Sequence, residues 1–157
     1  MNYVQVLSEC QEPEVGRAVL DGLTKLFEKD MQLLGVNASE ESVAAKIAQY
    51  LQPHFQDMDI DVEYNRMGDA PKKVTWNDKP AEVYPDIIVH LRGTQTNILA
   101  IELKKGSNAE SKDKDIRKLR AYVSELGYQH ALFLRLGVKD GAGDVSECEW
   151  VSPQGDT

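Results

Sequence analysis

The chain has 157 residues, 41% of them hydrophobic, and its 18 basic and 26 acidic side chains give a net charge of −8. This length and apolar content fit one globular domain over residues 1–157, and they exclude a disordered chain. The acidic total at first disfavours nucleic acid as a partner, because phosphate binding normally relies on a basic surface.

Two helices are predicted in the first third of the chain. Residues 13–34 begin with a proline, which suits a first turn, and carry apolar residues at roughly helical spacing. A polar break then offers Asn37 or Ser39 as the N-cap of a second helix that ends before Pro53. The apolar stripe of the second helix, extended back by one turn, places Glu40 on its inward side.

Strands are predicted in the middle of the chain. Residues 59–65 alternate between apolar and polar, which is typical of a half-buried strand. Residues 66–81 are rich in Gly, Pro and charge and predict a long surface connection, with one short strand inside it. Two apolar runs, 83–91 and 97–104, are joined by a short polar segment and predict a β-hairpin.

The last third continues with a helix and two strands. Residues 111–126 have a helical apolar stripe that ends at Gly127, and 128–136 form a strong strand. An edge strand is expected over 145–151, before a frayed polar end. The order α-α-β-β-β-α-β-β predicts an α/β fold with a mixed sheet flanked by helices, divided into an N-terminal helix at 13–34, a core at 37–136 and a C-terminal strand and tail at 137–157.

Neither a membrane-spanning protein nor a fold held together by disulfides or a cysteine zinc site is expected. The longest apolar runs are far shorter than the ~20 residues needed to cross a bilayer. Residues 1–12 lack a basic start followed by an apolar run, so we expect a cytoplasmic protein. Cys10 and Cys148 have no close pairing motif, so neither a disulfide framework nor a cysteine zinc site is expected.

The charge is distributed unevenly along the chain. Residues 104–120 hold seven basic and three acidic side chains, a local charge of +4, while the remainder carries 11 basic and 23 acidic residues and sums to −12. A basic segment therefore lies within an acidic body, and the whole-chain average hides it.

Three charged residues interrupt the apolar runs of the predicted hairpin. If the connection folds about Thr94, Asp86 and Glu102 become cross-strand neighbours. Lys104 lies two residues after Glu102, so the two side chains leave the strand on one face. Charged groups in the middle of apolar strands are costly unless they pair or bind an ion, and such departures from a core pattern are expected at functional sites.

These residues carry a family resemblance. Tyr84-Pro85-Asp86, fifteen residues, then Glu102-Leu103-Lys104, with Glu40 on an upstream helix and a basic helix downstream, resembles the PD-(D/E)XK restriction-endonuclease-like superfamily. The stretch 33–136, about two thirds of the chain, is similar to a group of small, mostly uncharacterised prokaryotic and phage proteins with that fold. The resemblance implies a restriction-endonuclease-like core and a cytoplasmic nuclease.

The resemblance also implies a metal-dependent mechanism. Asp86, Glu102, the main-chain carbonyl of Leu103 and Glu40 would supply oxygen ligands to Mg²⁺ or Mn²⁺. The cation would lower the pKa of a bound water and neutralise charge on the attacked phosphate. Lys104 would position that water and stabilise the negative transition state.

The substrate implied is nucleic acid, with DNA favoured over RNA. Its expected contacts are Lys105, Lys114, Lys118 and Tyr122. The family often places Gln four residues before the helical Tyr, where this chain has Lys118. The substitution keeps a phosphate-contacting donor but puts any contact of that Gln with a base in doubt.

Structural interpretations of the same residues stay open. Asp86 can end a strand in a salt bridge with Lys104 or Lys105, and Glu40 can complete a capping box with Asn37. Glu41 replaces Glu40 if the helix is rotated. The basic side chains of the downstream helix can form an ordinary solvated face, and Tyr122 can belong to the core.

The leading hypothesis is hydrolysis of phosphodiester bonds in nucleic acid by a Mg²⁺- or Mn²⁺-dependent endonuclease. The alternative is a catalytically silent nuclease fold that binds nucleic acid or a protein partner in a defence, repair or phage complex. A homodimer is an open expectation, because a short nuclease needs two active sites to cut both strands.

Overall fold

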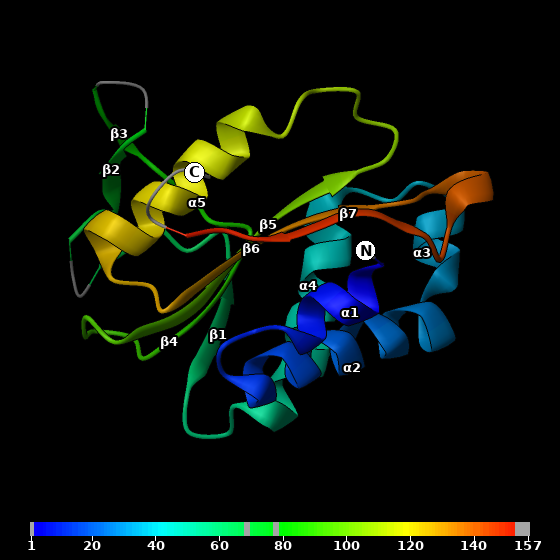
Figure 1. The fold of residues 1–157 in the computed structure, drawn as a ribbon, viewed down its shortest axis with the longest axis horizontal. Coiled ribbons are helices and arrows are strands. Elements are labelled where there is room, and N and C mark those ends of the chain that lie inside the picture. Colours follow the sequence, from blue (N-terminus) through cyan, green and yellow to red (C-terminus); the bar gives the residue numbers. More distant parts are fainter. Residues whose placement is uncertain (1, 68–69, 77–78, 153–157) are drawn as a thin grey trace.

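The centre of the fold is a mixed five-stranded sheet in the order β1-β4-β5-β6-β7 (Figure 1). The computed structural model describes residues 2–67, 70–76 and 79–152. The strands of the main sheet are β1 (Asp59–Val62), β4 (Ile87–His90), β5 (Asn97–Lys105), β6 (His130–Leu136) and β7 (Val145–Trp150). A separate pair, β2 (Lys73–Thr75) and β3 (Pro80–Glu82), forms a two-stranded antiparallel sheet.

Helices cover both faces of the main sheet. They are α1 (Tyr3–Ser8), α2 (Pro13–Lys29), α3 (Met31–Gly35), α4 (Glu40–Leu51) and α5 (Asp113–Leu126), with two 3-10 turns, η1 (Gln52–His54) and η2 (Lys139–Gly141). Helices α1, α2 and α4 lie on one face, and α5 lies on the other together with β2 (Figure 1). The predicted α/β class with helices flanking a mixed sheet is confirmed.

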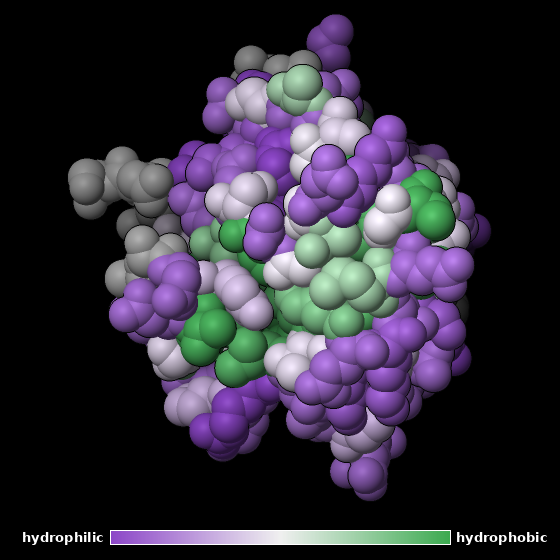
Figure 2. Space-filling view, turned by 90° about the vertical axis from the view of Figure 1, so that its right-hand side faces the viewer, coloured by the Kyte–Doolittle hydropathy of each residue, from purple (hydrophilic) through white to green (hydrophobic). Residues whose placement is uncertain are grey.

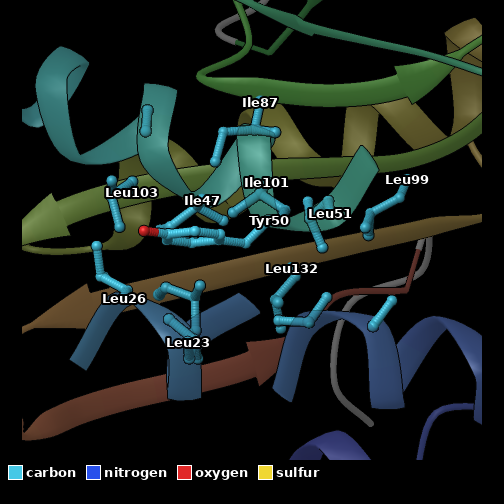
Figure 3. Packing of buried hydrophobic residues seen from close by; sticks show 14 of the residues in the cluster. Leu23, Leu26, Ile47, Tyr50, Leu51, Ile87, Leu99, Ile101, Leu103 and Leu132 are labelled. Atoms are coloured by element: carbon cyan, nitrogen blue, oxygen red, sulfur yellow. The ribbon is translucent and has the colours of Figure 1, made fainter. Parts of the chain in front are cut away.

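The larger core lies between the sheet and the helices α2 and α4. Figure 3 shows Leu23 of α2 and Ile47 of α4 facing Ile101 and Leu132 of the sheet. These four side chains are fully buried. Alternate apolar residues of β4 and β5 point to this core or to the smaller one under α5.

From Ile87 to Val89 the pairing of β4 with β5 has the predicted register, which shifts by one residue at His90. Ile87 lies opposite Ile101 and Ile88 opposite Ala100 in an antiparallel pair. Asp86, one residue before β4, therefore falls opposite Glu102. The strand β6 runs parallel to β5, with Leu99 opposite His130, and α5 forms the crossover between them.

Four local predictions need correction. The helix expected over 13–34 is interrupted at Asp30, which caps the end of α2 and accepts a hydrogen bond from the hydroxyl of Tyr50. Helix α1 was not predicted, because six residues are too few to show a periodicity. The strand expected over 59–65 ends at Val62, since Glu63 has a positive φ of 53°. The connection 66–81 contains β2 as expected, but Pro80 already belongs to β3.

The edge strand expected over 145–151 is β7, which pairs antiparallel with β6. Of the expected frayed tail, residues 153–157 lie outside the described part of the chain. Within the described ranges, none of the helices has the length and apolarity needed to cross a membrane. Figure 2 shows that one side of the molecule is mostly hydrophilic, with an apolar area near its centre.

Candidate active site

The candidate site lies where β5 continues past the start of β4. The backbone N–H of Leu103 lies beyond the paired residues of β4 and donates instead to Oδ2 of Asp86 at 2.7 Å. Two residues further, the N–H of Lys105 donates to Oε2 of Glu40 at 3.0 Å. Two carboxylates from different elements therefore take the place of a neighbouring strand along the last residues of β5.

The main-chain carbonyl of Leu103 points toward these carboxylates. The N–H and C=O of one residue leave a β-strand on the same side, and the N–H of Leu103 faces Asp86. The carbonyl therefore faces the same side of β5, between the N–H that binds Asp86 and the N–H that binds Glu40. Three of the predicted oxygen ligands thus border one short segment of strand edge.

Glu102 lies on the face of the sheet that is covered by α5. Its side chain is 6% exposed and accepts a hydrogen bond from the hydroxyl of Tyr122 at 2.8 Å. Burial, followed by the negative charge of Asp86, raises the pKa of Glu102 well above its ordinary value. Tyr122 is fully buried, and this position makes it a support for Glu102 in the core of α5.

Asp86 is half-buried and its ionisation is also disfavoured. Burial raises the pKa of its carboxyl group to about 6, and the charges of Glu40 and Asp115 act in the same direction. The hydrogen bond from the Leu103 N–H favours the ionised form but does not outweigh burial. The register of β4 and β5 puts Asp86 opposite Glu102, and the negative charge of each carboxylate disfavours ionisation of the other.

Lys104 shares the strand face of Glu102 and is paired with acids. Its ammonium lies 3.1 Å from Oδ2 of Asp115 and 3.4 Å from Oε2 of Glu110. Burial acts to lower the pKa of Lys104, but the two carboxylates outweigh it and raise the pKa. Lys104 is therefore a fixed cation beside the Asp86 and Glu102 pair.

Sequence reasoning missed Asp115 and Glu110. Asp115 is 7% exposed in the first turn of α5, and it lies seven residues before Tyr122. Seven residues make about two helical turns, so that spacing already placed Asp115 on the helix face that carries Tyr122. Glu110 lies in an irregular loop, where no periodicity predicts a direction. Arg135 of β6 fixes this loop by donating to the carbonyls of Asn108 and Glu110 at 2.7 and 2.8 Å.

The predicted substrate contacts lie in different surroundings. The ammonium of Lys105 donates to the carbonyl of Ala38 at 3.2 Å, which ties β5 to the start of α4. Lys114 and Lys118 each lie 5.4 Å from the centre of the Trp76 ring, and Arg117 lies 5.9 Å from it. Tyr122 has no exposed surface for a substrate.

The alternative carboxylates lie apart from this arrangement. Glu41 is exposed on α4, and the N-cap of that helix is Ser39, whose hydroxyl accepts the N–H of Ser42 at 3.1 Å. The alternative interpretation, a capping box between Asn37 and Glu40, is wrong, because Ser39 is the N-cap and Glu40 binds the backbone of Lys105. Glu40 is therefore the carboxylate of this helix that faces β5.

The donor set fits a hard divalent cation by its chemistry. Asp86, Glu102, Glu40 and the Leu103 carbonyl offer oxygen atoms only, and a cation would favour the ionised forms of Asp86 and Glu102, whose pKa values burial raises. Within the described residues, however, no three His, Cys, Asp or Glu side chains are already arranged to hold a metal ion.

Comparison with known proteins adds little to this geometry. No family model matches the chain, and no curated protein matches it. A solved structure titled "Crystal structure of SSO0001" is similar over 99% of this chain and 68% of that one, with 10% sequence identity and a TM-score of 0.44.

Proposed function

We propose that the chain is a metal-dependent phosphodiesterase that acts on nucleic acid, with DNA as the expected substrate, on a restriction-endonuclease-like core. The observation that supports this most directly is that the strand register puts Asp86 opposite Glu102, with Lys104 on the same strand face as Glu102. Two neighbouring carboxyl groups whose pKa values are both raised, beside a fixed cation, are unfavourable as a purely structural feature.

Each residue has a specific role in this proposal. Asp86, Glu102, Glu40 and the Leu103 carbonyl would hold Mg²⁺ or Mn²⁺, and Tyr122 would keep Glu102 oriented. The chemistry that such a cation supplies when bound is an acidified water and neutralisation of phosphate charge. Lys104 would stabilise the charge that develops on the phosphate, and Asp115 would hold Lys104 in place.

The experiment compares cleavage of plasmid DNA, single-stranded DNA and RNA in Mg²⁺ or Mn²⁺. We expect Glu102→Gln and Lys104→Ala to reduce cleavage by about 100-fold or more, since each removes a group that acts on the transition state. The matched controls are Glu82→Gln and Lys73→Ala, which change exposed residues of β2 and β3. Equal cutting by the wild type and the Glu102 and Lys104 variants would mean that the activity comes from a contaminant, and would reject the proposal.

A second function is favoured by the pairing of Lys104. An ammonium held by both Asp115 and Glu110 is less free to act on a phosphate. This supports a catalytically silent module that binds nucleic acid or a protein partner. Calorimetry separates the two functions: an active site predicts a Mn²⁺ binding event that Asp86→Asn abolishes, whereas a silent module predicts no such event in either protein.

A further inference from the structure

A second group of reactive side chains lies at the opposite end of the sheet. Cys10 and Glu12 belong to the connection between α1 and α2, and His130 begins β6. His130 pairs with Leu99 of β5, five residues before Lys104, so the group lies about 17 Å along the strands from the carboxylate site. The mechanism proposed above uses none of these three residues.

The three side chains form a continuous hydrogen-bonded chain. The sulfur of Cys10 lies 3.8 Å from Nδ1 of His130, and Nε2 of His130 lies 2.9 Å from Oε1 of Glu12. An ionised carboxylate can only accept, so it fixes the proton of the neutral imidazole on Nε2. Nδ1 then presents its lone pair to the thiol. This is the order of nucleophile, base and orienting carboxylate found in nucleophilic catalysis.

The thiol opens into a pocket of about 330 Å³, which is large enough for a small organic molecule. Its apolar walls are Val123, Trp150 and Val151, and its polar walls include the amides of Gln11 and Gln129. Among the described residues that line it, Glu9 is the only Asp, Glu, Lys or Arg. The lining therefore favours an uncharged ligand over an anion such as a phosphate.

The surrounding residues hold the His130 imidazole in position and keep the Cys10 thiol protonated. The ring of Trp150 meets the His130 imidazole edge-on, with 6.2 Å between centroids. The Cys10 side chain is almost fully buried, and burial raises the pKa of its thiol, while hydrogen bonds from the backbone of Glu12 and Gly16 act in the opposite direction. A protonated thiol needs a base at its proton before it can attack, and Nδ1 occupies that position.

We infer that Cys10, His130 and Glu12 form an acyl-transfer site for a small uncharged carboxylic ester or thioester. The Cys10 sulfur forms a bond to the acyl carbon, and the bond from that carbon to the leaving oxygen or sulfur breaks. The thiol proton passes to Nδ1 of His130 and then to the leaving group. A water activated by the same nitrogen hydrolyses the thioester, which releases the acid and restores the thiol.

The test uses the full chain and p-nitrophenyl acetate as the probe. Nitrophenolate release is followed by absorbance, and mass spectrometry of peptides locates the acetyl group. We expect acetylation of Cys10 to be much faster than that of Cys148, whose thiol pKa burial raises to about 12. This comparison needs no variant. Acetylation of both thiols at the same slow rate would overturn the inference.

Substitutions of the three residues then distinguish a catalytic role from a role in packing. We expect Cys10→Ala to abolish the fast phase and His130→Gln to slow it about 100-fold, as loss of a general base does. Glu12 is a positioning residue, so Glu12→Ala should slow acetylation less, and Glu12→Asp should restore part of the rate. His54→Gln and Glu14→Gln are matched controls that should react like the wild type. A folded His130→Gln variant with the wild-type rate would reject the assignment.

Discussion

The carboxyl group of Asp86 is the residue-scale feature with the clearest pH dependence. Its folded pKa of about 6 exceeds the ordinary value of 3.8, so between these values the folded chain binds more protons than the unfolded chain. The free energy of unfolding should therefore fall as pH rises from about 4 to about 6, by at most about 3 kcal/mol. Asp86→Asn removes this loss and should stabilise the metal-free protein at neutral pH.

Denaturant unfolding between pH 4 and pH 8, without divalent cations, checks this prediction. The amide introduced by Asp86→Asn would still accept the N–H of Leu103 through its side-chain oxygen, so the backbone contact is kept. Asp57→Asn changes an exposed carboxylate and serves as the control. A variant at Asp86 whose stability follows the same pH curve as the wild type would contradict the assigned pKa.

The pair formed by Lys104 and Asp115 should be energetically coupled. Both side chains are about nine-tenths buried and their charged atoms are 3.1 Å apart. Asp115→Asn leaves the ammonium with only the exposed Glu110, and we expect a loss of about 2 kcal/mol in the free energy of unfolding. A double-mutant cycle with Lys104→Met should return a coupling of about 1–3 kcal/mol.

The exposed pair of Lys25 and Asp21 is the control for the double-mutant cycle on Lys104 and Asp115. Its atoms are 3.0 Å apart, but each side chain is 35% exposed. Solvent screening should reduce its coupling to about 0.5 kcal/mol or less. Equal coupling in the two cycles would show that burial does not strengthen the Lys104 pair.

The relative positions of the site residues could be predicted from the sequence only where strand pairing determines them. Folding the hairpin about Thr94 places Asp86 opposite Glu102, and the pairs from Ile87 to Val89 keep that register although it shifts at His90. The partners of Lys104 depend instead on how α5 docks and on the course of the loop 106–112, which Arg135 fixes from another strand. The spacing to Tyr122 indicates the helix face of Asp115, but it does not indicate that this face meets Lys104.

At the scale of elements, Gly16 permits the close approach of α1 to α2. A Cβ at this position would lie 2.1 Å from the carbonyl oxygen of Leu7 and 3.3 Å from the Cβ of Cys10. Gly16→Ala gains about 1 kcal/mol of helix propensity, but the oxygen belongs to the backbone and cannot move without shifting α1. We expect a net loss of about 1–3 kcal/mol in the free energy of unfolding.

Thermal or urea unfolding of Gly16→Ala beside Gly35→Ala checks this packing argument. Among the described residues, no atom lies within 4 Å of the corresponding Cβ position at Gly35, so that substitution should leave stability nearly unchanged. If the two variants are equally stable, α1 is not packed against α2 as described.

Elements with long periodic patterns were predicted well, and short ones were not. Helix α5 ends at Gly127 as expected, because this residue adopts a positive φ of 73° that glycine readily accepts. The interruption at Asp30 was missed, since the apolar spacing continues from α2 into α3 while the backbone does not. The break is a tertiary effect, because its hydrogen bond comes from Tyr50 of α4.

At the scale of the whole molecule, the positive charge of the segment 104–120 is spread over several places, and Lys112 is paired with Glu147 and Glu149 of β7. Lys104 and Lys105 lie inward at the end of β5, where carboxylates and a carbonyl bind them. Three cations of α5, Lys114, Arg117 and Lys118, gather around Trp76, which follows β2. A nucleic acid drawn to this molecule would therefore meet positive charge on α5, while the acidic remainder repels it elsewhere.

Salt dependence of DNA binding tests this arrangement. Each phosphate neutralised on a duplex contributes about −0.9 to the slope of log K against log salt concentration. If Arg117 and Lys118 each contact one phosphate, the double alanine variant should weaken binding similarly for all sequences and reduce the magnitude of the slope by about 2. Lys25→Ala and Lys29→Ala remove the same charge from α2, on the opposite face of the sheet, and should leave the slope unchanged. An equal change in both pairs would mean that only total charge matters and that α5 is not the binding face.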